Sequence, residues 1–260
     1  MSREVGAIGI IAYRDIVKFL KDKPRILTSL IFPVIFIGFF GKGLQASIGQ
    51  FTGFNYLTFV FTGILAQTLY QSTASGVIWL IRDRESDFSQ EIFISPVSRY
   101  SIIFGKIFGE SLVALTQAIG IVAFGLVIAV PFAFTQIVAI IPIALIACFL
   151  GGAFGVLVLS LINSQRAVDQ IFPLLLFPQF FLAGVFSPID NLPPFLSFLS
   201  RITPMTYAVD LMRNVFYAGT TEYGKVVLHN PTLNITVSAV MFAVFLVIGT
   251  RLFVRKESNR

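Results

Sequence analysis

The residue types that usually carry enzymatic or metal chemistry are scarce in this chain and lie far apart. Its single histidine, His229, stands in a polar turn before Pro231, and its single cysteine, Cys148, lies in an apolar stretch. One histidine in such a turn makes a Ser–His–acid triad implausible, and the sequence holds no cluster with the spacing of metal ligands. It also lacks the Gly-x-x-x-x-Gly-Lys-Ser/Thr stretch of a phosphate-binding loop. We therefore predict that the chain by itself is not an enzyme and holds no cofactor.

The charged residues are few and lie between long apolar stretches. Of the 260 residues, 56% are hydrophobic and only 12% are charged, against about 25% charged in an average soluble domain. Residues 111–165 include no Lys, Arg, Asp or Glu, and Lys42 is the only charged residue between positions 26 and 81. A soluble domain needs a polar face on each surface helix. The composition therefore predicts an all-α polytopic membrane protein.

Six apolar segments are candidates to cross a bilayer, which takes about 20 residues. The first is short before Lys42, so we expect it to borrow residues from the preceding helix or to continue towards Ile48. Together they form a predicted membrane domain, residues 26–254, followed by a tail at 255–260. The predicted spans are residues 26–40, 54–81, 102–130, 137–162, 168–186 and 235–254.

The distribution of basic residues predicts the orientation of these spans. Of the 19 lysines and arginines, all but Lys42, Arg201, Arg213 and Lys225 lie before span one, after spans two and four, or at the C-terminal end. Basic residues favour the cytoplasmic side, so we place both termini in the cytoplasm at a prokaryotic plasma (inner) membrane. The net charge of +6 is then a topology signal, with anionic lipid headgroups rather than nucleic acid as partners.

The N-terminal segment, residues 1–25, has the pattern of an amphipathic helix. A basic face opposite an apolar one is typical of a helix lying in the headgroup plane; the alternative is a polar tail. The basic face includes Arg14, Lys18 and Lys21, and the apolar face comprises Val5, Ile8, Ala12, Ile16 and Phe19.

Polar residues inside the spans have two possible roles. Gln67, Gln71 and Ser75 recur every four residues in span two, so they share one face of a helix. That face could line a pathway or hydrogen-bond to another helix, and Gln179 in span five is a similar candidate. Lys106 and Glu110 are expected to pair at the cytoplasmic end of span three, partly in contact with water.

Small residues in span four predict a close helix contact, because they allow two backbones to approach. These residues are Ala147, Gly151 and Gly155.

The segment between spans five and six, residues 187–234, is expected to hold two short amphipathic helices. Asp190 and Asn191 are the candidate caps of the first, and Thr203 with Pro204 begins the second. Asp210 and Arg213 lie off the apolar face of the second helix, from where they could pair.

The loop after span two, residues 82–101, carries the densest charge between spans. Its run Arg84-Glu85, Glu91 and Ser95-Pro96-Val97-Ser98-Arg99 resembles the first cytoplasmic loop of ABC type-2 permeases, the membrane subunits of ATP-driven exporters of drugs and lipid-linked glycans. Asp87 and Phe88 depart from the glycine and threonine usual there. The segments Tyr13-Arg14-Asp15 and 186–213 also look like this family, so the resemblance spans nearly the whole chain.

The resemblance implies a coupling helix in residues 84–99 that docks on a cytoplasmic ATPase subunit. The residues expected to serve the coupling are Glu85, Glu91, Ser95, Pro96, Ser98 and Arg99. It also implies two ATPase subunits that hold the ATP and magnesium, a second permease copy, most simply a homodimer, and short re-entrant helices before the last span.

Three functions remain open at this point. The first is export of an amphiphilic drug or lipid, and the second is export of a lipid-linked glycan by the same architecture. The third is a channel, scaffold or secondary carrier without an ATPase partner. The spans themselves are generic enough to carry many substrates.

Overall fold

The computed structural model describes residues 2–81, 98–162, 164–190 and 192–258, and these residues form helices without any strand. Their order along the chain is α1 (Ser2–Lys21), α2 (Lys23–Phe36), the π-helix η1 (Ile37–Gly43), α3 (Leu44–Thr52), α4 (Tyr56–Ile78), α7 (Arg99–Val127), α8 (Phe134–Leu161), α9 (Gln165–Leu182), α10 (Pro194–Ile202), α11 (Pro204–Phe216), α12 (Tyr223–Val226) and α13 (Pro231–Ser258). The predicted all-α class is therefore confirmed.

Four helical segments in the described ranges are long and apolar enough to cross a membrane. They are Lys23–Ser47, Arg99–Val127, Thr135–Leu161 and Tyr223–Arg255. The two other predicted spans correspond to α4 and α9, which carry more polar residues. In α4 this polarity is compatible with its place inside the bundle, since 20 of its 23 residues are buried and face protein rather than lipid.

The first predicted span continues past Lys42, in agreement with the expected extension towards Ile48. Helical structure continues from Lys23 through η1 to Thr52, with Lys42 in the π-helical turn. A widened turn of this kind accommodates an extra residue without breaking a helix. Asp22 starts the run, because its side chain accepts a hydrogen bond from the backbone N–H of Arg25 at 3.1 Å.

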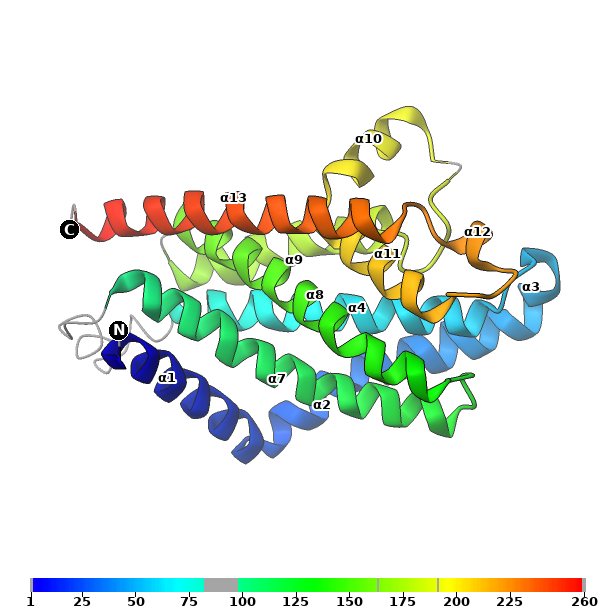
Figure 1. The fold of residues 1–260 in the computed structure, drawn as a ribbon, viewed down its shortest axis with the longest axis horizontal. Coiled ribbons are helices and arrows are strands. Elements are labelled where there is room, and N and C mark those ends of the chain that lie inside the picture. The colour runs from blue at the N-terminus through cyan, green and yellow to red at the C-terminus, as the bar shows by residue number, and fades with distance from the viewer. Residues whose placement is uncertain (1, 82–97, 163, 191, 259–260) are drawn as a thin grey trace.

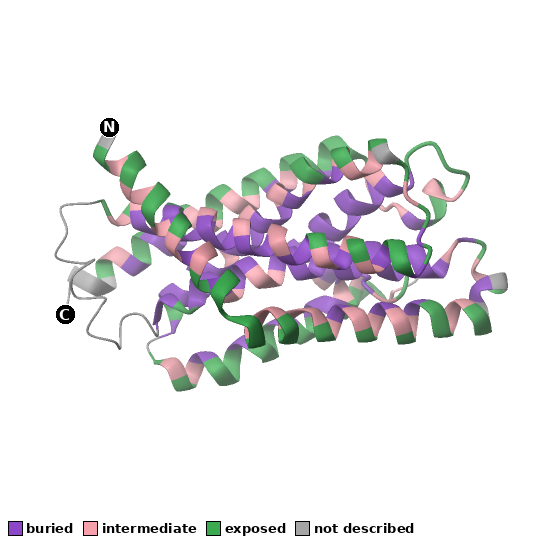
Figure 2. Ribbon diagram, turned by 90° about the horizontal axis from the view of Figure 1, so that it is seen from below, coloured by how far each residue is buried: buried purple, intermediate pink, exposed green. Residues whose placement is uncertain are grey.

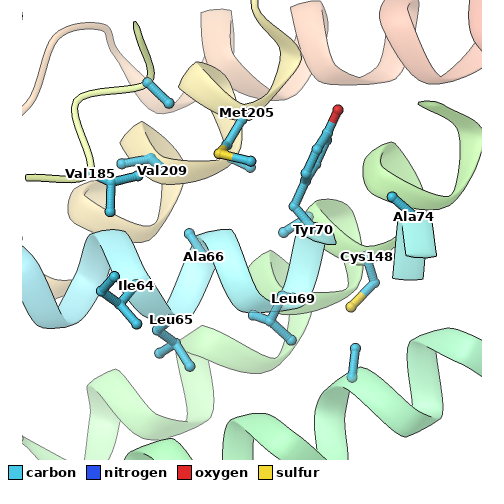
Figure 3. Close-up of a cluster of buried hydrophobic side chains, with 14 of the residues drawn as sticks. Ile64, Leu65, Ala66, Leu69, Tyr70, Ala74, Cys148, Val185, Met205 and Val209 are labelled. Atoms are coloured by element: carbon cyan, nitrogen blue, oxygen red, sulfur yellow. The ribbon is translucent and has the colours of Figure 1, made fainter. Parts of the chain in front are cut away.

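Helices α4 and α8 form the centre of the bundle and touch through glycine. A Cβ added at Gly151 would collide with the Tyr70 carbonyl, and one at Gly155 would lie 2.7 Å from the Ala74 carbonyl oxygen. The small-residue stripe of span four therefore does provide a close contact between backbones. Around it lies a core of α4, α8 and α11 side chains, in which Cys148 is fully buried (Figure 3).

The long helices lie roughly along one axis, and their buried residues gather in the interior of the bundle (Figures 1 and 2). The start of α1, the start of α7 and the end of α13 lie at one end, which we call the basal end. Helices α3, α10, α11 and α12 lie at the other, distal end (Figure 1). The chain therefore begins and ends on the same side of the bundle.

At the distal end, the bounds of α11 match the predicted start at Thr203 and Pro204, and Gly219 follows it with a φ of +76°. Asp190 does not cap the preceding helix, and Asn191 lies outside the described residues. That helix, α10, begins at Pro194 after Pro193, without a side-chain cap. Proline at this position is favoured because its fixed φ suits the first turn of a helix.

Candidate functional site

A polar cavity of about 340 Å³ lies among α2, α4, α7 and α9. Three residues of α4 that share one helical face, Gln67, Gln71 and Ser75, all line it, and Gln117 of α7 joins them. Apolar groups from α2 and α9 complete the wall. The remaining lining residues are Arg25, Thr28, Ser29, Phe32, Pro33, Thr68, Ser72, Trp79 and Phe180.

The glutamines of α4 hydrogen-bond within their own helix and not to a neighbouring one. Gln67 Nε2 donates to Gln71 Oε1 at 3.0 Å. Gln67 is only 1% exposed, and its Oε1 atom has no hydrogen-bond partner. An unpaired buried carbonyl oxygen costs about 1–3 kcal/mol, so this atom is a ready acceptor for a ligand. Gln179 does not line the cavity, and its Nε2 donates to Leu175 in its own helix.

A cluster of charged side chains adjoins the cavity near the basal end. Lys106 Nζ lies 2.9 Å from Asp15 Oδ2 and 2.7 Å from Glu110 Oε1. Arg14 pairs with the other Asp15 oxygen at 2.9 Å, and Arg25 lies 3.8 Å from Glu110 Oε2. We call these five residues the basal charge cluster. It joins α1, α7 and the start of α2 through ionic contacts.

The predicted pair of Lys106 and Glu110 is therefore present, but it is not in contact with water as expected. Lys106 is 5% exposed and Glu110 is 3% exposed. The reason is that α1 packs directly over them. Glycines on α7 permit this approach, because a Cβ at Gly109 would lie 2.9 Å from the Ala12 Cα atom.

The predicted N-terminal helix is present as α1, but its inner face includes a carboxylate. Ala12, Asp15 and Phe19 are buried, whereas Val5, expected on the apolar face, is 64% exposed. Lys18 and Lys21 are exposed, and Arg14 is half-buried beside Asp15. The helix therefore uses its inner face for packing on α7.

Most of the residues predicted to couple to an ATPase, namely Glu85, Glu91, Ser95 and Pro96, lie outside the described residues. Ser98 and Arg99 are described and stand at the start of α7, where the Ser98 side chain accepts a hydrogen bond from the Tyr100 N–H. The Glu4 carboxylate accepts from the backbone N–H of Ser98 at 3.2 Å. Hydrogen bonds from Ser101 and Ser98 lower the pKa of Glu4. The start of α1 is thus tied to the end of the predicted coupling loop.

At the distal end, Asp210 and Arg213 are both 1% exposed but do not pair directly. Asp210 accepts hydrogen bonds from the backbone N–H groups of Leu228 and His229, each at 2.8 Å, and from Asn234. Arg213 donates to the Gly184 carbonyl and lies 3.6 Å above the Phe59 ring. Asp210 therefore binds the segment between α12 and α13 to α11, and Arg213 binds the segment after α9 to α11.

Replacing Asp210 by asparagine should destabilise the protein by about 2 kcal/mol, because a carboxylate that accepts three hydrogen bonds becomes an amide with donors of its own. Thermal unfolding of the purified protein in detergent measures the loss. Asp190→Asn is the matched control, since Asp190 is exposed. Equal melting temperatures for the two variants would contradict this role.

Two residues of this site, Asp15 and Arg25, escaped the sequence reasoning, whereas Gln117 was a candidate with less pattern than the glutamines of span two. Asp15 interrupts the apolar face of α1 at helical spacing between Ala12 and Phe19, which was the available signal for a buried partner. Arg25 is one of several basic residues before the first span, and nothing in the sequence separates it from the others. Gln117 stood alone in its span, so no spacing connected it to the glutamines of α4.

Long apolar helices packed around a cavity are typical of a polytopic membrane protein. The chain belongs to the ABC-2 type transporter family, whose model matches residues 6–217. This confirms the family predicted from residues 84–99. The family is one of transport permeases rather than of enzymes.

Three transport permeases that are similar to this chain support the same family. The chain is 24% identical over 241 residues to ycf38 of Cyanophora paradoxa, named as a transport permease, which covers 90% of this chain and 83% of the relative. It is 25% identical over 197 residues to the inner membrane transport permease YadH of Escherichia coli strain K12, covering 74% of each. It is 27% identical over 136 residues to YbhR of the same strain, named as a multidrug ABC transporter permease, covering 52% of this chain and 37% of YbhR.

Proposed function

We propose that this chain is the membrane subunit of an ATP-driven exporter that moves an amphiphilic substrate, a drug or a lipid-like molecule, out of the cytoplasm or the inner leaflet. The observation that carries this proposal is the polar cavity inside an otherwise apolar bundle. Its size falls within the range of small-ligand sites, roughly 300–1,000 Å³. Its lining combines amides and hydroxyls with the rings of Phe32 and Phe180, as an amphiphile requires.

In this proposal the subunit crosses the plasma membrane six times, with α4 and α9 as the two less apolar spans and both termini in the cytoplasm. The start of α1 and the end of α13 both lie at the basal end (Figure 1). This arrangement supports an even number of crossings. The basic residues of α1, including Lys18 and Lys21, then lie at the cytoplasmic headgroups. Two such subunits and two ATPase subunits make the transporter.

The coupling to ATP hydrolysis is assigned to residues 82–101. This loop follows α4 and precedes α7, two helices that line the cavity. A force applied to the loop by a moving ATPase therefore reaches the cavity through both helices. The contact of Glu4 with Ser98 and the basal charge cluster also tie α1 to the same unit. The size of the cavity favours a small amphiphile over a lipid-linked glycan.

Replacing Glu91 by alanine should reduce substrate-stimulated ATP hydrolysis about tenfold, since loss of one hydrogen bond to a charged group at the docking surface is worth roughly 1.5–3 kcal/mol. Replacing Pro96 by alanine should also reduce it, because alanine no longer ends the coupling helix at this position. The measurement is ATPase activity and transport by the reconstituted complex of permease and ATPase subunits. Ser86→Ala is the control, because it alters the same loop at a position outside the family pattern. Unchanged coupling in both variants would refute the assignment of the loop.

A further inference from the structure

We propose that the cavity selects amphiphiles with an anionic headgroup, and that Arg25 is the residue that binds the charge. This inference rests on the proposed function, because it names the substrate class of the same transporter. Of the described residues that line the cavity, only Arg25 is charged. Its side chain is 20% exposed, so it is partly removed from water and still open to a ligand. Guanidinium groups bind phosphate and carboxylate groups with two parallel hydrogen bonds.

Among the described residues, Arg25 has one ion pair in the basal charge cluster, with Glu110. The basal charge cluster contains three cations, Arg14, Arg25 and Lys106, and two carboxylates, Asp15 and Glu110. Lys106 lies within 2.9 Å of both carboxylates, whereas Arg25 approaches Glu110 only to 3.8 Å. The Glu110 carboxylate is therefore held more closely by Lys106 than by Arg25, and Arg25 is the cation of the cluster that lines the cavity.

One aromatic surface that could attract a cation, the ring of Trp79, is already covered. The guanidinium carbon of Arg25 lies 4.4 Å from the centre of the Trp79 ring, which is a cation–π contact. A cationic amphiphile would have to displace Arg25 from that ring and would then face its charge. The same stacking orients the guanidinium, so less conformational entropy is lost when an anion binds.

The rest of the lining suits the part of the molecule next to the charged group. The α4 face between Trp79 and Gln67 is 12 positions long, or about 18 Å of helix. Going from Trp79, the cavity is lined first by Ser75, then by Gln71, and then by Gln67 with its unpartnered Oε1 atom. Phe32 and Phe180 lie on the opposing helices. We therefore expect an anionic headgroup at Arg25, hydrogen-bonding groups along α4 and an apolar chain against the phenylalanines.

Trp79 is the only tryptophan in the chain, and it lines the cavity, so it reports on binding directly. The full chain is reconstituted in phosphatidylcholine vesicles, and brominated dodecyl phosphate, dodecyl trimethylammonium and dodecyl maltoside are added at equal bilayer-bound concentration. We expect the phosphate to quench Trp79 fluorescence at the lowest concentration. Arg25→Gln should raise its half-quenching concentration about tenfold, as expected for one charge-assisted hydrogen bond, and Arg25→Lys should raise it less.

Lys23→Gln is the matched control, because it also removes one positive charge and lies only two residues from Arg25 in the sequence. The Lys23 side chain is exposed and does not line the cavity. Equal quenching by the three probes, or equal shifts in Arg25→Gln and Lys23→Gln, would overturn the inference. If Arg25→Gln does not fold, Gln71→Leu tests the same cavity and should also weaken quenching by the phosphate. No ATPase subunit is involved, so this experiment can fail while the coupling-loop experiment succeeds, and the reverse.

Discussion

Replacing Lys106 by alanine is expected to destabilise the protein by about 3–5 kcal/mol, the cost of leaving a buried charge without its partner. Lys106 lies within hydrogen-bonding distance of both Asp15 and Glu110, and all three side chains are nearly inaccessible. Without the ammonium group, the buried carboxylates of Asp15 and Glu110 lose their shared partner, and the contacts with Arg14 and Arg25 remain. We expect α1 to detach, since Asp15 can reach water only by leaving the surface of α7.

Thermal unfolding in detergent measures the overall loss, and hydrogen exchange of residues 2–21 shows whether α1 has detached. The double variant Asp15→Asn with Lys106→Gln removes one charge of each sign and should recover more than half of the lost stability, because the two sites are coupled. A fully additive loss in the double variant would show that Lys106 acts by packing and not by pairing.

Replacing Gly151 by alanine should cost about 3 kcal/mol, near the upper end of the range for overpacking a tight interior. The added methyl group would collide with the backbone carbonyl of Tyr70 in the middle of α4. Backbone on both sides leaves no flexible side chain to yield, so α4 and α8 must separate. Because α4 also lines the cavity, we expect ligand quenching of Trp79 to weaken as well.

Gly9→Ala is the matched control for Gly151→Ala, since it makes the same chemical change in the middle of a helix. A Cβ at Gly9 meets nothing within 4 Å, and alanine favours the helix over glycine by about 1 kcal/mol. The melting temperature should therefore rise for Gly9→Ala and fall for Gly151→Ala. A rise in both would show that α4 and α8 have room to adjust.

The helices could be predicted well from the sequence because a bilayer imposes one strong condition. Backbone polar groups must be satisfied within the segment, so a long apolar stretch has little choice but to form a helix. The apolar stretch of α8 therefore predicted a helix, and its small residues, including Gly151, predicted its contact face. The continuation of the first span towards Ile48 was also expected, but the π-helical turn by which the backbone passes Lys42 was not, because hydropathy carries no signal for it.

The polar contacts were much harder to predict, because they join residues distant in the chain. Asp15 and Lys106 are 91 positions apart, and no local pattern relates them. Asp210 and Arg213 were expected to be able to pair because they are one helical turn apart. In the structure Asp210 accepts from the backbone of Leu228, and Arg213 donates to the backbone of Gly184. Local spacing shows which side chains can meet on one helix, and it does not show which neighbour competes for them.

Composition by itself determined that this is an all-helical membrane protein, because desolvation of a polar backbone leaves few alternatives in an apolar chain. The resemblance of its motifs, in their order, indicated the ABC-2 type transporter family. Tertiary structure alone decided that the face of Gln67, Gln71 and Ser75 borders a cavity and that one of several basal arginines, Arg25, enters it. The physical reason is that a cavity and its charge are properties of packing among α2, α4, α7 and α9, and no single helix contains them.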